Sequence, residues 1–325
     1  MLTSILLFAV GLVLLIKGGD WFVDGATGIA KRFRLPDIVV GATVVSIGTT
    51  LPEVMVSTAG ALTGSGAMAY GNAIGSIICN TALIAAISIT CNPGPVNVKS
   101  MKPPAVFFFG AAALYFLASY VLGEFPRWIG FVMLGIFVIY MITTVRNGLK
   151  NPDTACEEPE EEDGKQRTLL AELILLVIGA AVIAVGAELL VEHGQVIARS
   201  LGVPETVVAL LFVALGTSLP ELITTIASLR SGHASLGVGN VIGANVFNLV
   251  LVSGVAVSLA PFRIPCENFL LDTNLNMTLV FELPVMLGVM SLMIFPALAT
   301  RKLHRWQGIV LLGIYAAFCV CQFIL

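Results

Sequence analysis

Long apolar runs, separated by short polar or Pro- and Gly-containing stretches, follow one another along almost the whole chain. The runs exceed the roughly 20 residues that a helix needs to cross about 30 Å of hydrocarbon, and they lack the period-two alternation of an outer-membrane barrel. We therefore expect an all-α, polytopic membrane protein. The pattern predicts ten transmembrane helices, near residues 3–30, 36–63, 67–92, 104–122, 126–146, 168–199, 204–230, 235–261, 278–300 and 306–325.

Composition favours the same class. Of the 325 residues, 57% are hydrophobic and 11% are charged, which is too apolar for a soluble protein, and the chain is too long for a single span. The first run has no preceding basic residue and no clear small-residue cleavage site, so we interpret it as a retained span rather than a secretory signal. The six cysteines show no metal-ligand spacing, and we interpret them as small packing residues.

One short stretch occurs twice in the chain. Residues 46–53 read Ser-Ile-Gly-Thr-Thr-Leu-Pro-Glu, and residues 214–221 read Ala-Leu-Gly-Thr-Ser-Leu-Pro-Glu, at an offset of 168. One constant offset that also relates many neighbouring positions indicates a duplicated unit. The same offset relates Gly18 to Gly186, Asp20 to Glu188, Pro36 to Pro204, Gly71-Asn72 to Gly239-Asn240, Gly75 to Gly243 and Asn80 to Asn248.

The duplication predicts how the chain is organised. We expect a first five-helix repeat in residues 1–146, a linker in 147–167 and a second five-helix repeat in 168–325. Six acids lie close together in the linker, which we expect to be solvated, with a regulatory calcium site as the alternative. These acids are Glu157, Glu158, Glu160, Glu161, Glu162 and Asp163.

Basic residues predict the orientation of the spans. With the N-terminus outside, three basic residues (Arg127, Arg199 and Arg263) fall on the outside and thirteen on the inside, so the linker is expected to be cytoplasmic. Five spans per unit then give the two repeats opposite orientations, as in secondary transporters, whose sites lie near the midplane. The inner residues are Lys31, Arg32, Arg34, Lys99, Lys102, Arg146, Lys150, Lys165, Arg167, Arg230, Arg301, Lys302 and Arg305.

The repeated stretch carries the candidate chemistry. Glu53 and Glu221 each place a carboxylate inside an apolar span, where a lone charge costs several kcal/mol. Pro52 has no N–H to donate to the carbonyl of Gly48, so we expect the helix to break there, and Pro220 repeats the arrangement. Such irregular backbone is tolerated at membrane depth only where it is buried in protein or lines a cavity. Carboxylate, hydroxyl and carbonyl oxygens together predict a site for hard cations, calcium first and sodium as its competitor.

The following span of each unit adds a polar face. Asn72, Ser76 and Asn80 are spaced by four residues, and the second copy has Asn240, Ala244 and Asn248 at the same spacing. Residues four apart lie on one face of a helix. We therefore expect polar faces from both units to meet at one site.

These segments resemble the two alpha-repeats of the cation/calcium antiporter superfamily, most closely the sodium/calcium exchanger family of prokaryotic type. The resemblance rests on residues 41–53 with 71–80, and on 213–221 with 239–248. It implies ten helices, alternating access by sliding of the first helix of each repeat, and exchange of several sodium ions for one calcium. It also implies the plasma (inner) membrane of a prokaryote, with calcium and sodium as transported ions, no other cofactor and no nucleic-acid partner.

The resemblance also implies roles for individual residues. Glu53 and Glu221 would bind both calcium and sodium, while Thr49 and Thr217 would offer backbone carbonyls to calcium. The sodium sites would be completed by Thr50, Ser218, Ser76 and the carbonyls of Ser46 and Ala214, and the middle site would be lined by Asn80 and Asn248.

Two departures from the family pattern bear on ion coupling. Ala244 stands where the first repeat has Ser76, which removes a hydroxyl, and Asn248 stands where several relatives carry Asp. Proton/calcium antiport is therefore kept as an alternative. A cation channel and a membrane-embedded enzyme are alternatives of other classes, but the chain has no His-Glu-x-x-His motif and no nucleophile with an adjacent base, so we expect a transporter and not an enzyme.

Overall fold

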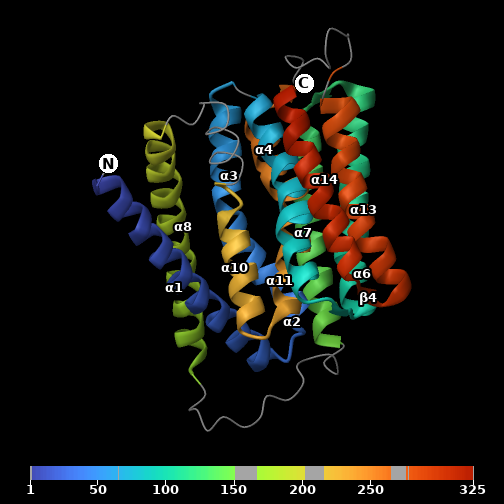
Figure 1. Ribbon diagram of the computed structural model, residues 1–325. Helices are drawn as coiled ribbons and strands as arrows, with labels where there is room; N and C mark the ends of the chain where they lie inside the picture. The colour runs from blue at the N-terminus through green and yellow to red at the C-terminus, as the bar shows by residue number, and fades with distance from the viewer. Residues whose placement is uncertain are drawn as a thin grey trace.

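The computed structural model describes residues 2–64, 66–150, 167–201, 216–264, 276 and 278–324, and these form a bundle of long helices (Figure 1). The α-helices are α1 (Leu2–Phe33), α2 (Asp37–Val40), α3 (Ser46–Leu62), α4 (Gly66–Cys79), α5 (Ala86–Cys91), α6 (Val98–Phe116), α7 (Arg127–Lys150), α8 (Leu169–Ser200), α10 (Leu219–Arg230), α11 (Ala234–Phe247), α12 (Ser253–Leu259), α13 (Leu283–Thr300) and α14 (Arg305–Ile324). Segments of π-helix connect or extend several of them, namely η1 (Gly41–Val45), η2 (Asn80–Ala85), η3 (Leu117–Leu122), η6 (Asn248–Val252) and η7 (Thr278–Glu282). The strands have two residues each, β1 (Gly94–Pro95), β2 (Glu124–Phe125), β3 (Phe262–Arg263) and β4 (Lys302–Leu303).

The predicted class is confirmed. Within the described residues, nine helical spans are long and apolar enough to cross a membrane, and each overlaps one of the ten predicted positions. The remaining predicted span, 204–230, is described only from residue 216 onward, where α10 begins at Leu219. The acids of the linker lie outside the described residues.

Two predicted boundaries are wrong. The span predicted to begin at residue 104 begins with α6 at Val98, because the side chain of Asn97 accepts hydrogen bonds from the backbone N–H groups of Lys99 (3.0 Å) and Ser100 (3.4 Å). This cap starts the helix before the proline pair that was expected to precede it. The span predicted to end at residue 146 continues in α7 to Lys150.

Segments of π-helix interrupt the spans at equivalent positions of the two halves. η2 begins at Asn80 and η6 begins at Asn248, which are related by the offset of 168. A π turn alters the regular backbone pairing and is frequent at functional sites. Hydroxyl groups support this backbone, since Ser46 Oγ donates to the carbonyl of Gly41 (2.8 Å) and Ser253 Oγ donates to the carbonyl of Asn248 (3.0 Å).

Two short antiparallel ribbons join the halves of the chain. β1 pairs with β4, and β2 pairs with β3. Because α6 and η3 form one membrane-length helix between β1 and β2, the ribbons lie at opposite ends of the bundle. The offset of 168 converts β1 into β3, and an offset of 178 converts β2 into β4, so exchange of the two halves converts one ribbon into the other. An inverted repeat predicts this relationship.

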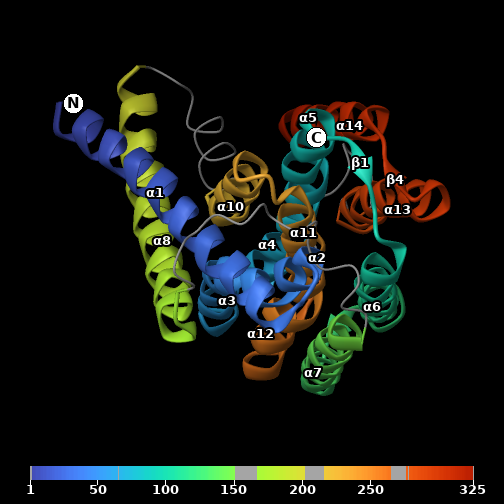
Figure 2. The same ribbon diagram turned by 90° about the horizontal axis from the view of Figure 1, so that it is seen from below.

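Helices α1 and α8 pack side by side at one edge of the bundle, next to α10 (Figures 1 and 2). Glycines bring their backbones together: a Cβ atom on Gly11 would lie 2.9 Å from the carbonyl oxygen of Gly186, and one on Gly18 would lie 3.1 Å from that of Gly179. The offset of 168 converts Gly11 into Gly179 and Gly18 into Gly186, so these two contacts also exchange. Small residues at such positions allow close approach of membrane helices.

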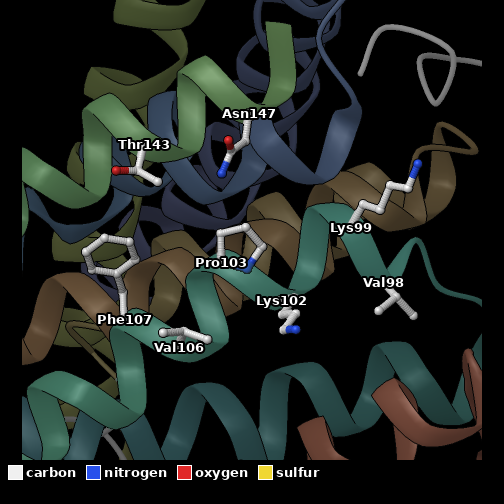
Figure 3. A pocket seen from close by; sticks show the side chains of 8 residues that line it. All are labelled: Val98, Lys99, Lys102, Pro103, Val106, Phe107, Thr143 and Asn147. Atoms are coloured by element: carbon white, nitrogen blue, oxygen red, sulfur yellow. The ribbon is translucent and has the colours of Figure 1, made fainter. Parts of the chain in front are cut away.

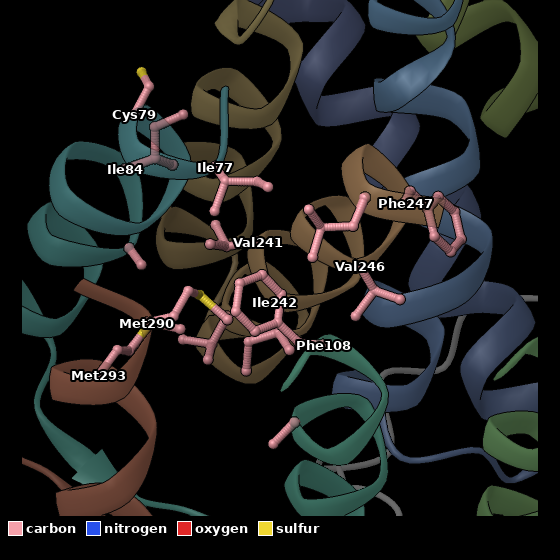
Figure 4. Packing of buried hydrophobic residues seen from close by; sticks show 14 of the residues in the cluster. Ile77, Cys79, Ile84, Phe108, Val241, Ile242, Val246, Phe247, Met290 and Met293 are labelled. Carbon is pink, nitrogen blue, oxygen red and sulfur yellow. The ribbon is translucent and has the colours of Figure 1, made fainter. Parts of the chain in front are cut away.

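The core lies between α4, α6, α11 and α13, and α11 is at its centre (Figure 4). Every residue of α11 from Leu236 to Phe247 is buried. Phe247 packs edge-on against Phe137 and Tyr140 of α7, while Met290 of α13 lies on another side of the helix (Figure 4). In a membrane, dense packing of this kind holds helices together, so α11 is a firm support for the polar residues that it carries.

Candidate cation-binding site

The first copy of the repeated motif lies in α3, which runs without interruption from Ser46 to Leu62 and contains Pro52. The predicted helix break at Pro52 is therefore wrong. Membrane helices tolerate an internal proline when neighbouring groups accommodate the freed backbone, and here the irregular backbone lies before α3, in η1, which ends about two turns before Pro52. The missing side chain of Gly48 leaves room for the ring of Phe22, which would lie 3.1 Å from a Cβ atom at that position.

The second copy of the motif has a different backbone. Gly216, Thr217 and Ser218 form a turn, and α10 begins at the next residue, with Pro220 in its first turn. Proline is favoured there because the first N–H groups of a helix have no intrahelical partner. Glu221 also lies in this first turn, where the positive end of the helix dipole favours a negative charge. Ala214 lies outside the described residues.

Glu53 and Glu221 are both fully buried. They meet between the two halves of the chain: Thr50 Oγ1 donates to Glu221 Oε1 at 3.5 Å, and the two carboxylates are close enough to repel each other. Among the described residues, neither oxygen of Glu53 has a hydrogen-bond partner, and Glu221 Oε2 also lacks one. No ion pair between described residues includes either acid. Burying unpaired carboxylates is costly, so this arrangement calls for cations.

Other buried polar atoms surround the acids and are also unpaired. Both side-chain amide atoms of Asn80 and of Asn248 lack a partner in the described part of the chain, as does Ser218 Oγ, and all three side chains are almost completely buried. The π-helical segments that begin at the two asparagines pack against the opposite half, η2 against α10 and η6 against α3. Ser76 and Ala244 are buried at the equivalent positions of α4 and α11. The structure therefore brings the predicted residues of both halves together.

Two asparagines link each half to the motif of the other half. Thr49 Oγ1 donates to Asn240 Oδ1 (3.2 Å), and Thr217 Oγ1 donates to Asn72 Oδ1 (3.4 Å). The offset of 168 converts the first bond into the second. Asn72 Nδ2 also donates to the backbone carbonyl of Glu53 (3.3 Å), so one amide connects both copies of the motif. The sequence indicated a shared polar face for these asparagines, but not these partners.

Close helix contact holds Ser46 in place. Besides the carbonyl of Gly41, its hydroxyl oxygen lies within hydrogen-bond distance of the backbone carbonyl oxygen of Asn240 (2.9 Å) and 3.3 Å from Asn240 Oδ1. Gly243 permits this approach, because a Cβ atom there would lie 2.6 Å from the Cα atom of Ala42 and would also collide with Ser46 Oγ. Gly243 therefore allows α11 to pack directly against η1 and α3.

Several buried polar residues beside the site were missed by the sequence analysis. Ser57 accepts a hydrogen bond from Asn72 (2.9 Å) and Thr224 accepts one from Asn240 (2.9 Å). Asn245 donates to Thr81 Oγ1 (2.7 Å), and its own Oδ1 is buried without a partner among the described residues. Ser57 and Thr224 each follow a motif glutamate by three or four residues, the helical spacing that could have identified them.

The donor set defines the chemistry. Within the described part of the chain, no group of three or more His, Cys, Asp or Glu side chains is placed to hold a metal ion. The ligands available are therefore two carboxylates with neutral hydroxyl, amide and carbonyl oxygens. Oxygen donors of this kind select hard cations over zinc or copper, which prefer nitrogen or sulfur.

Comparison with known proteins places these features in a family. The profile of the family described as sodium/calcium exchanger protein matches residues 3–146 and 171–324. An uncharacterized membrane protein of Methanocaldococcus jannaschii is 34% identical, covering 95% of this chain and 94% of its own length. Sodium/calcium exchanger MaX1 of Methanosarcina acetivorans is 28% identical over 98% of both chains. A solved structure of the sodium-calcium exchanger NCX_Mj superposes with a TM-score of 0.78 at 32% identity, covering 97% of both chains.

Proposed function

Because the chain belongs to the sodium/calcium exchanger family, we propose that it exchanges sodium for calcium across the membrane, with both ions bound between its two repeats. The observation that carries this proposal is the pair of buried carboxylates, Glu53 and Glu221, with three oxygens that lack partners among the described residues. Two negative charges balance one calcium ion, and the same oxygens can hold singly charged sodium ions in its place. Competition for shared ligands is the basis of exchange.

The proposed ligand roles follow the family pattern. Asn240 and Asn72 accept the hydroxyl hydrogens of Thr49 and Thr217, and the backbone carbonyls of these threonines are the proposed calcium ligands. The sodium sites are completed by Thr50, Ser218, Ser76 and the carbonyls of Ser46 and Ala214, and the middle site is lined by Asn80 and Asn248.

Alternating access is supported by the packing of α1 and α8. Their glycine contacts and the ion pair between Arg32 and Glu172 (3.1 Å) favour movement of the pair as one body. This body covers the two halves unequally. Ala227 of α10 is 4% exposed and packs against Gly19 of α1, whereas the equivalent region of α3 is open, with Met55 71% exposed. If α1 and α8 moved so that α3 became covered and α10 became open, the ion site would be exposed to the opposite side of the membrane.

The two ribbons and the exchangeable glycine contacts support ten helices in two inverted repeats, 1–146 and 168–325, joined by the 147–167 linker. We place the N-terminus outside and the linker in the cytoplasm of a prokaryote, because the end of the bundle that holds β1 and β4 also carries Lys99, Lys302 and Arg305.

Radioactive calcium flux into proteoliposomes tests the function. Sodium, potassium and proton gradients are imposed singly, and an outward sodium gradient is expected to drive calcium uptake. Calcium flux that needs no counter-ion gradient would instead indicate a channel. Uptake driven by a pH gradient and not by sodium would indicate proton/calcium antiport, an alternative that the missing hydroxyl at the buried Ala244 favours.

A further inference from the structure

A cavity of about 590 Å³ lies between α6 and α7, away from the proposed ion site. Lys99 and Lys102 of α6 and Asn147 of α7 contribute polar side chains, while Val106 and Phe107 contribute apolar ones. Figure 3 shows Thr143 and Asn147 pointing from α7 toward Pro103 and Phe107 on α6, with Lys99 on the same side of α6. The cavity therefore combines positive charge at one end with an apolar surface along its length.

The two lysines lie where a membrane protein meets lipid headgroups. Asn97 caps the start of α6, so Lys99 and Lys102 occupy its first two turns, and both side chains are exposed. Val106 follows one turn deeper and is 60% exposed. A negatively charged group at the level of the lysines, attached to an apolar chain that extends past Val106, would match this order of polar and apolar positions.

The second repeat shows that the fold does not require these lysines. The offset of 178 that relates β2 to β4 also relates Lys99 to Met277 and Lys102 to Val280, and it relates Thr143 to Cys321. The equivalent positions of the second repeat therefore carry no charge, so the fold of such a helix needs no lysine there. The same asymmetry follows the excess of basic residues that places this end of the bundle in the cytoplasm, where acidic lipid headgroups are found.

We propose that this cavity binds the headgroup of an anionic phospholipid. The phosphate pairs with the ammonium groups of Lys99 and Lys102, as basic pockets between membrane helices do with acidic lipids. Thr143 and Asn147 provide polar contacts to the headgroup, and an acyl chain lies along Val106 and Phe107.

The bound lipid would border elements that lead to the ion site. Gly148, which follows Asn147, packs so closely against Val39 of α2 that a Cβ atom would lie 3.0 Å from that side chain. About two turns before Asn147 in α7, the Tyr140 hydroxyl donates to the carbonyl of Ala42 in η1 at 2.7 Å. Occupancy of the cavity therefore stabilises α7 against the segment that continues into α3. The binding itself does not depend on which ions are transported.

Native mass spectrometry of the purified full-length protein tests this proposal, with phosphatidylglycerol and phosphatidylcholine as probes. We expect one tightly held phosphatidylglycerol, and a loss of about 30-fold in its affinity in the K99Q/K102Q double variant. The matched control is K31Q/K302Q, which removes two exposed lysines that do not line the cavity. It is expected to bind like the wild type. T143W, which fills the cavity and leaves both lysines in place, is expected to displace the lipid.

Three outcomes would overturn the proposal. Equal binding of the two lipids would remove the charge argument, and an equal loss in both double variants would reduce it to general surface charge. Displacement of phosphatidylglycerol by an equal concentration of inorganic phosphate would identify a free anion as the ligand instead. Since each readout is binding, the result does not depend on whether sodium/calcium exchange is demonstrated.

Discussion

Glu53→Gln tests the proposed ion site most directly, because it removes one negative charge and preserves the size of the side chain. The Glu53 carboxylate is fully buried, and neither of its oxygens has a partner among the described residues. Removing one partner of a buried pair of opposite charges, here the carboxylate that faces the bound calcium ion, costs about 3–5 kcal/mol. We therefore expect calcium affinity to fall by roughly two to four orders of magnitude, and calcium uptake by sodium-loaded vesicles to be lost.

The same substitution is expected to stabilise the protein when no ions are bound. The carboxylates of Glu53 and Glu221 repel each other, and among the described residues neither oxygen of Glu53 has a hydrogen-bond partner. The introduced amide is neutral, so it removes this repulsion and a buried, unpaired charge that is costly to desolvate. The variant should therefore unfold at a higher temperature than the wild type in the absence of calcium and sodium, although it binds neither ion well.

Thermal unfolding with and without calcium measures both effects, and radioactive calcium uptake measures transport. Glu282→Gln is the matched control, because Glu282 also lies in a membrane-length helix but its Oε1 accepts a hydrogen bond from Gln322 Nε2 (3.1 Å). Calcium should stabilise this control as it stabilises the wild type. If calcium stabilised Glu53→Gln to the same extent as the wild type, or if uptake by that variant stayed near normal, the assignment of the ion site would be wrong.

Three further predictions concern the interface between the repeats. Asn240→Ala should weaken calcium affinity several-fold, since each lost hydrogen bond contributes about 0.5–1.5 kcal/mol. Its effect should not add to that of Thr49→Val, because the two side chains act through their shared bond. Additive effects on the calcium concentration for half-saturation would contradict this. Gly11→Ala should destabilise the protein by about 1–3 kcal/mol through overpacking. Gly135→Ala should not, because no atom of a described residue lies within 4 Å of the added Cβ, and equal melting temperatures of the two variants would disprove the close contact at Gly11. Ala244→Ser should lower the sodium concentration for half-maximal exchange several-fold, because the added hydroxyl contributes about 1 kcal/mol to sodium binding. An unchanged sodium dependence would show that position 244 does not contact the sodium site.

The sequence predicted the helices well because their signal is local. Each span needs a run of apolar residues of sufficient length, and Pro, Gly and charged residues mark the ends. Errors arose where one side chain changed a boundary, as at Asn97, whose cap begins α6 before the proline pair. Pro52 misled for a related reason: the loss of one N–H was expected to break the helix, but packing between helices keeps α3 continuous.

The candidate site was predicted in its composition but not in its connections. The repeated motif and its offset were enough to select Glu53 and Glu221, which the structure buries together. The bond between Thr217 and Asn72 joins residues that are 145 positions apart, and it depends on which helices of opposite halves become neighbours. The unequal backbone of the two motifs, a continuous helix in α3 and a helix start in α10, also has no local signal, because the sequences of the two copies are nearly the same.

The paired ribbons bear on how such a chain arose. Each half supplies one strand to the ribbon at each end of the bundle. Each half also contributes glycines of α1 or α8 that pack closely against the other half. A single half would therefore be left with unsatisfied edges and exposed grooves, whereas two identical copies inserted in opposite senses would complete each other as a closed two-fold dimer. The simplest precursor is a dual-topology homodimer whose gene was later duplicated and fused, and co-expressed fragments divided within the linker should still assemble.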